Sequence, residues 1–171
     1  MRLTSFTDYC LRVLIFTATH PQGRTTIAEI ARAYGISEHH LVKVAHFLGR
    51  AGFLTNLRGR GGGLALARPA GQINVGAVVR AAEGEAMPAA CFDAAAARCA
   101  IAPVCRLKGV LAEAVDAFYA VLGASTLGDL VQDRAALRQL LAVPATLAAA
   151  ALAPPAARPE AFPTGRLSVR R

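Results

Sequence analysis

The sequence lacks the features of an exported or membrane-spanning protein. Its first residues, MRLTSFTDYC, pass from a polar start directly into an amphipathic pattern, whereas a signal peptide has a charged region followed by an apolar block. No uninterrupted apolar run is long enough to cross a bilayer, and the hydrophobic fraction of 54% comes largely from alanine. We therefore expect a cytoplasmic protein whose cysteines stay reduced.

Catalytic patterns and acidic residues are also scarce. No nucleophile–base pair or acidic dyad stands out, so an enzyme has no support. The glycine run at residues 61–63 lacks the Gly-Lys-Ser/Thr ending of a phosphate-binding loop.

The chain has 11 Asp/Glu against 19 Lys/Arg, and its net charge of +8 favours a polyanionic partner. Residues 1–68 contain nine of these Lys/Arg but three of the Asp/Glu, so the basic character belongs mainly to the front of the chain.

Residues 1–83 show the pattern of a winged helix-turn-helix DNA-binding domain within a mainly α protein. A first amphipathic helix is predicted over residues 5–20, because apolar residues recur there at helical spacing. Cys10 falls on the apolar face, and we interpret it as a small buried residue rather than a ligand. Thr26 and Glu29 have capping-box spacing, which predicts that a second helix begins there.

A third helix, over residues 38–50, is predicted to enter the major groove of DNA. Gly35 supplies the turn before it, and the Ser37 side chain is expected to cap it. Its apolar stripe leaves a polar, partly cationic face on the opposite side. A plain αα-hairpin with a solvated histidine face is the alternative. The candidate DNA contacts are Ser37, His39, His40 and Lys43.

Two short strands, over residues 53–57 and 64–67, are predicted to form the wing. A glycine-rich turn joins them and carries Arg58 and Arg60. Guanidinium groups on such a tip can reach phosphates or a narrow minor groove, although a solvated hairpin tip is the simpler reading. A short helix over residues 75–82 then completes the domain.

Residues 84–105 form a loop in which Cys91, Cys99 and Cys105 follow the spacing C-x7-C-x5-C. Thiolates are soft ligands for iron–sulfur clusters, zinc or copper(I). The long gaps do not fit the paired cysteines of structural zinc, whereas clusters tolerate irregular spacing, so we rank a cluster above a redox thiol pair and above zinc. Three cysteines leave one ligand to be found. The candidates are Asp8 of the partner subunit, Glu85, Asp93 and an exogenous molecule.

A long helix is predicted from residue 106 to about residue 122, followed by a last helix over residues 127–141. We assign residues 106–141 to a dimerisation helix and the helix after it, although packing of the long helix on its own domain is an alternative. Residues 142–171 are rich in Ala and Pro, and we expect a mostly disordered tail. The long helix carries apolar residues at the four-three spacing of a dimer seam, namely Leu107, Leu111, Ala114, Phe118 and Val121.

Three segments together resemble the NsrR family of nitric-oxide-sensing iron–sulfur repressors, winged-helix proteins related to the regulator IscR. They are MRLTSFTDYCLRVL, GRGGGLALARP and CAIAPVCRLKGVLAEAVDAF, and the resemblance extends over about residues 1–132. The chain departs from the family in its first cysteine gap, which is usually shorter. IscR-type members have a histidine where this chain has Lys108, so the chain resembles the nitric-oxide-sensing branch instead.

The resemblance implies a 2Fe–2S or 4Fe–4S cluster held by Cys91, Cys99 and Cys105, with Asp8 of the partner subunit as the fourth ligand. It also implies a homodimeric repressor that binds operator DNA while the cluster is intact and releases it when nitric oxide nitrosylates the cluster. A regulator that senses iron or cluster status is the first alternative. A small redox or electron-transfer protein is another, but the basic wing argues against it.

Overall fold

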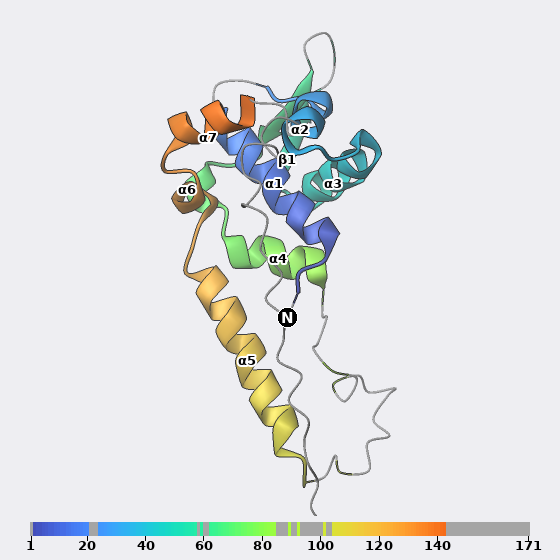
Figure 1. Ribbon diagram of the computed structural model, residues 1–171, viewed down its shortest axis with the longest axis vertical. Helices are drawn as coiled ribbons and strands as arrows, with labels where there is room; N and C mark the ends of the chain where they lie inside the picture. Colours follow the sequence, from blue (N-terminus) through green and yellow to red (C-terminus); the bar gives the residue numbers. More distant parts are fainter. Residues whose placement is uncertain are drawn as a thin grey trace, which may run out of the picture.

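The computed structural model describes residues 2–20, 24–57, 59, 62–84, 89, 92, 101 and 104–142. It confirms a mainly α winged helix-turn-helix fold with a two-stranded wing. The head contains α1 (Ser5–Thr19), α2 (Ile27–Tyr34), α3 (Glu38–Arg50), β1 (Leu54–Leu57), β2 (Gly63–Leu66), η1 (Ala70–Gln72) and α4 (Val75–Glu83). The long helix α5 (Arg106–Gly123) extends away from it, and α6 (Leu127–Leu130) and α7 (Arg134–Ala142) return to it (Figure 1).

Local capping explains where the helices of the head begin. At the start of α1, the Thr4 hydroxyl accepts a hydrogen bond from Thr7 N at 3.2 Å. The predicted capping box of α2 is present, since Thr26 and Glu29 each bond the other's backbone N–H. Ser37 stands at the cap position of α3 but makes no side-chain cap hydrogen bond, so the expected capping role of Ser37 is wrong.

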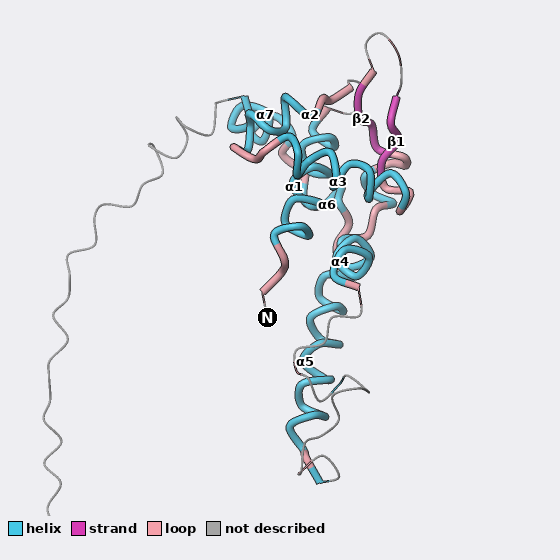
Figure 2. Tube along the Cα trace, turned by 90° about the vertical axis from the view of Figure 1, so that its right-hand side faces the viewer, coloured by secondary structure: helices cyan, strands magenta, loops and turns pink. Residues whose placement is uncertain are grey.

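The wing is a two-stranded antiparallel hairpin beside α3, at the opposite end of the molecule from the start of α5 (Figure 2). β1 begins one residue later than predicted and ends at Leu57 as predicted, because Phe53 N bonds Leu48 O at the end of α3 and so precedes the strand. β2 begins and ends one residue earlier than predicted, since Gly63 pairs with Leu57. Thr25 adds a bridge to Leu64 on the outer edge of β2. Gly63 is required there, because a Cβ would lie 2.8 Å from Thr25 O. The wing-tip residues Arg58 and Arg60 lie outside the described residues.

The core of the head is built around α1. Cys10, Val13 and Leu14 on this helix are fully buried, and α2, α3, β2 and α6 add further apolar side chains. Burial raises the pKa of the Cys10 thiol to about 12, which keeps it protonated near neutral pH. The prediction that Cys10 is a buried structural residue is confirmed.

Helix α5 is attached to the head through α4. Its Val115 and Tyr119 are buried against Val79, and the Arg80 guanidinium lies 4.0 Å from the centre of the Tyr119 ring. Near the end of α5, Gly76 approaches Gly123 so closely that a Cβ on Gly76 would lie 2.8 Å from the Gly123 nitrogen. This contact fixes the point from which α5 projects.

The segment after α5 forms two helices rather than the single helix predicted over residues 127–141. A capping box of Thr126 and Asp129 starts α6, and the Asp133 carboxylate accepts a hydrogen bond from Ala136 N at 2.9 Å to start α7. Leu127 and Val131 enter the core of the head, and α7 contacts α1 and α2. The caps at Thr126 and Asp133 therefore divide this segment into two helices, although its apolar spacing continues as in a single helix. No helix in the described part of the chain is long and apolar enough to cross a membrane.

Candidate metal centre and nucleic-acid interface

The structure describes one of the three candidate cysteine ligands. Cys105 is a free, half-buried thiol at the position just before α5, and its side chain makes no cap hydrogen bond. Cys91 and Cys99 lie outside the described residues. Within the described residues, no three His, Cys, Asp or Glu side chains gather into a group that could hold a metal ion. The described residues around Cys105 therefore do not form a complete metal site by themselves.

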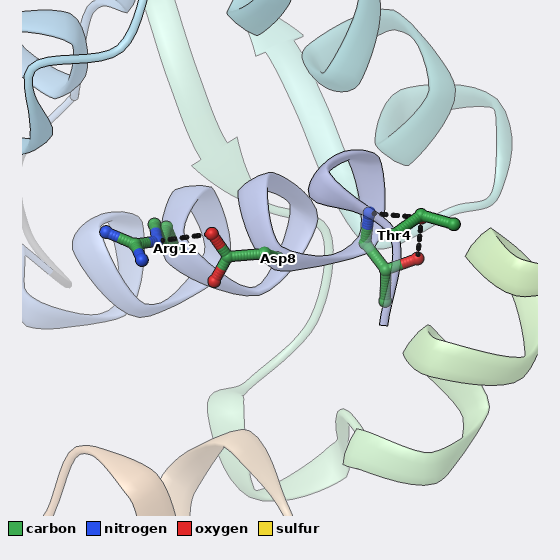
Figure 3. Close-up of polar contacts among 4 residues, drawn as sticks. Thr4, Asp8 and Arg12 are labelled. Atoms are coloured by element: carbon green, nitrogen blue, oxygen red, sulfur yellow. Dashed lines mark hydrogen bonds and ion pairs between the residues drawn. The ribbon is translucent and has the colours of Figure 1, made fainter. Parts of the chain in front are cut away.

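Asp8 lies on the exposed side of α1 and is paired with a residue on the same helix. Its Oδ2 accepts a hydrogen bond from Arg12 Nε at 2.8 Å, and the two side chains remain 44% and 43% exposed (Figure 3). Arg12 also lies 5.5 Å from the centre of the Tyr34 ring. Burial raises the pKa of Tyr34 to about 12, while the charge of Arg12 lowers this pKa and the charge of Asp8 raises it. The carboxylate is thus oriented but accessible.

Asp8 and Cys105 do not come together within one chain. The buried contact of α5 with the head reaches Val115, and the helix projects beyond it for about 15 Å before it reaches Cys105. Figure 1 shows the start of α5 at the end of the molecule farthest from the head. A shared centre consequently requires a second subunit.

A polar contact that sequence reasoning missed joins the start of α1 to the end of α4. Glu83 Oε1 accepts hydrogen bonds from Thr4 N at 2.8 Å and from Thr4 Oγ1 at 3.1 Å. Partial burial alone would raise the pKa of Glu83, but hydrogen bonds from Thr7 and Thr4 outweigh burial and hold the pKa below its ordinary value. Because Glu83 is the last residue of α4, this contact anchors the point from which the cysteine loop departs.

The candidate DNA contacts of α3 share one exposed surface. Leu41, Val44, Ala45 and Leu48 are buried, as predicted for the packing stripe. Val42 was missed: it is apolar yet 56% exposed among the polar residues of this surface. Its position off the packing stripe was the signal that sequence reasoning had available. The exposed set includes all four predicted contacts on this element, Ser37, His39, His40 and Lys43.

Comparison with known proteins gives the geometry a family context. A family model described as "Iron-dependent Transcriptional regulator", Rrf2, matches residues 3–133. The chain belongs to the Rrf2 family. It is therefore a transcriptional regulator and not an enzyme, as the sequence predicted.

Individual Rrf2 relatives are similar over most of their length. The chain is 48% identical over 142 residues to the HTH-type transcriptional regulator NsrR of Geobacillus kaustophilus (strain HTA426) and 47% identical over 142 residues to NsrR of Bacillus subtilis (strain 168). Each match covers 82% of this chain and 97% of the relative. Among solved structures, T. potens IscR superposes with a TM-score of 0.63 at 25% identity, covering 78% of this chain and 88% of that one.

Proposed function

We propose that this Rrf2 regulator is a homodimeric repressor that holds an iron–sulfur cluster, binds operator DNA while the cluster is intact, and releases the DNA in response to nitric oxide. Its similarity to two NsrR regulators supports this proposal, as does the family description as iron-dependent. Its DNA target would place it in the cytoplasm. The observation that carries the proposal is that Cys105 and Asp8 lie far apart within one chain. A dimer formed through α5 would bring Cys105 of one subunit close to Asp8 of the other.

The exposed face of α5 fits a second copy of the chain. Val115 and Tyr119 use a neighbouring face for the contact with α4, and Phe118 of the predicted seam packs partly against the same cluster. On the predicted seam, Leu107 is 62% exposed and Val121 is 71% exposed. Apolar side chains repeated along a helix are stabilised when a partner helix covers them. A second α5 supplies such a cover.

The seam also indicates how the two helices run. Leu107 and Val121 lie at equal sequence distances from Ala114, so an antiparallel pair centred there places each Leu107 against the partner's Val121. In that arrangement the start of one α5 lies beside the end of the other, close to the partner's α4 and α1. A parallel pair would instead hold both Cys105 residues away from both heads. The antiparallel dimer is thus the one that can bring Cys105 to Asp8 of the partner subunit.

The described donors suit a negatively charged cluster. Cys105 lies at the N-terminus of an 18-residue helix, where the helix dipole and unpaired backbone N–H groups favour anions. Arg106 and Lys108 add positive charge in the first turn. Asp8 keeps an exposed carboxylate, which Arg12 orients. When bound, the cluster would supply iron that reacts with nitric oxide, and Cys91, Cys99, Cys105 and Asp8 of the partner subunit would hold it.

Operator recognition is assigned to α3 and the wing. Lys43 offers a positive charge for phosphate, and Ser37, His39 and His40 offer hydrogen-bonding groups for base edges. Val42 adds an apolar surface suited to the methyl group of thymine. Arg58 and Arg60 at the wing tip are proposed to contact the phosphate backbone or the minor groove of the operator DNA.

Anaerobic purification followed by titration with nitric oxide tests the proposal. The protein should carry iron and sulfide with a visible absorption band, and nitric oxide should bleach the band and release a labelled operator duplex in parallel. Cys105→Ala should lose iron and operator binding. Cys10→Ala is the matched control and should keep both, because Cys10 is buried in the head. A colourless zinc protein, or equal operator binding with and without the cluster, contradicts the proposal.

A regulator that senses iron or cluster status is the second candidate, because the matched family is described as iron-dependent. The two candidates differ in the agent that releases the operator. Release by nitric oxide at constant iron content supports the first. Release by an iron chelator, with no response to nitric oxide before iron is lost, supports the second.

A further inference from the structure

Helices α1 and α3 meet through two aromatic pairs. The Tyr9 and His40 rings are stacked, with centroids 6.1 Å apart and planes 26° from parallel. The Phe6 and Phe47 rings meet edge to face at 5.2 Å. Tyr9 is partly buried against the main core, whereas His40 is exposed on the surface proposed to contact DNA. The Tyr9–His40 pair therefore reaches from the interior to the recognition surface.

A cavity lies beside the Tyr9–His40 pair, so the stack of these two rings contributes to holding α3 in position on α1. A cavity of about 290 Å³ lies between the two helices, lined by Ser5, Phe6, Tyr9, His40, Lys43 and Val44. Close packing normally fixes the position of one helix on another. The interface is open at this cavity, so the start of α3 is held on α1 by the buried Leu41 and Val44 on one side of the opening and by the stack on Tyr9 on the other.

We propose that Tyr9 is a positioning residue for DNA binding: its ring holds His40, and with it the DNA-facing end of α3, at the place set by α1. The inference rests on the proposed function in one respect, the role of Asp8 as a ligand. Neighbouring residues project about 100° apart around a helix, so Asp8 faces outward while Tyr9 faces α3. A movement of α1 caused by loss of the Asp8 ligand would reach His40 through Tyr9.

Tyr9→Leu and Tyr9→Phe form a matched pair for the test. Operator duplexes would be selected from random duplexes with the iron-loaded wild type, and affinity measured by fluorescence anisotropy on iron-loaded and demetallated protein. Tyr9→Phe keeps the stacked ring and should bind like the wild type. Tyr9→Leu should weaken operator binding by the iron-loaded protein about 2- to 12-fold, the range expected for loss of one aromatic pair. Its demetallated form should change less, so that the ratio between the two states becomes smaller.

A double-mutant cycle separates the stack from a direct base contact by His40. Tyr9→Leu combined with His40→Leu should bind no more weakly than His40→Leu alone, since the stack is already lost. Additive effects would overturn the proposal, and so would wild-type binding by iron-loaded Tyr9→Leu. Thermal unfolding and sedimentation verify that each variant is a folded dimer.

Two further outcomes are distinguishable. If Tyr9→Leu does not fold, His40→Phe and His40→Leu take its place. Both remove the polar groups of His40, but the phenylalanine variant keeps a ring for Tyr9 to stack on, so a smaller loss of binding in His40→Phe than in His40→Leu supports the stack, and equal loss in both overturns it. If wild-type protein binds equally with and without iron, the proposed function fails. The Tyr9→Leu and His40→Leu double-mutant cycle on demetallated protein then tests the positioning role independently of the cluster. Non-additive losses of operator affinity support that role, and additive losses overturn it.

Discussion

Replacing Val121 with alanine should weaken the proposed dimer without unfolding the subunit. The substitution removes two apolar carbon groups, each worth about 0.8 kcal/mol when fully buried. Val121 is 71% exposed in the single chain, so most of this burial is available to a partner. A two-fold dimer contains the substitution twice, and we expect a loss of about 2 kcal/mol, or about a 30-fold rise in the dimer dissociation constant.

Sedimentation equilibrium over a range of concentrations measures this constant directly. Leu140→Ala is the matched control, because Leu140 is 69% exposed but lies on α7, outside the seam. Val115→Ala provides the opposite contrast: Val115 is buried against α4, so its loss should lower the unfolding temperature of the subunit. A Val121→Ala protein that dimerises as tightly as the wild type, or a Leu140→Ala protein that dissociates equally, would refute the assignment of the seam.

The direction of the helices can be tested on the same residues. Leu107→Lys and Val121→Asp should each weaken their own homodimer, because each places a charge on an apolar seam. A mixture of the two proteins should form a heterodimer in the antiparallel arrangement, since the lysine of one chain then meets the aspartate of the other. In a parallel pair these charges would face apolar side chains instead. Absence of a preferred heterodimer would exclude the antiparallel dimer.

Three further predictions concern the subunit itself. Glu83→Gln should lower the unfolding temperature at neutral pH, and its difference from the wild type should shrink as the pH falls below about 4. A carboxylate with a lowered pKa stabilises the fold above its unfolded pKa, and this stabilisation is lost as the pH falls through the lower folded value; a difference that stays constant into the acid range would contradict this. In reduced, demetallated protein, iodoacetamide should label the half-buried Cys105 but not the fully buried Cys10, as mass spectrometry of peptides would show. Gly76→Ala should destabilise the fold by about 1–3 kcal/mol in urea unfolding, whereas Gly71→Ala, which meets no atom within 4 Å, should be nearly neutral.

Helix boundaries were predictable where the signals are local. The capping box of Thr26 and Glu29 lies within four residues, and α2 begins where it predicts. Gly35 ends the same helix in the left-handed conformation, with a φ of 65°. Asp133 is a local signal too, but the apolar spacing continues through it, and the break between α6 and α7 was therefore missed.

Contacts between distant segments were not predictable from periodicity. Thr4 and Glu83 are 79 positions apart, and neither residue type indicates the other as its partner. The Asp8–Arg12 pair is different, because an acid four residues before a base is a recognisable helix pattern. The candidate donor residues could accordingly be named from the sequence and remain a prediction, whereas the Thr4–Glu83 contact between the start of α1 and the end of α4 could not.

The position of α1 explains how the two proposed activities can be coupled over a short distance. One side of this helix carries the half-exposed Asp8, the proposed ligand for a partner's loop, and another carries Tyr9, which contacts α3. Between them, Cys10 and its apolar neighbours fix the helix in the core of the head. A helix packed in this way is rigid, so a displacement at Asp8 is passed along α1 to Tyr9 and can bias α3 together with the core residues packed on it. This reasoning requires that removing the Asp8 ligand and removing the Tyr9 ring reduce the same iron-dependent difference in operator affinity.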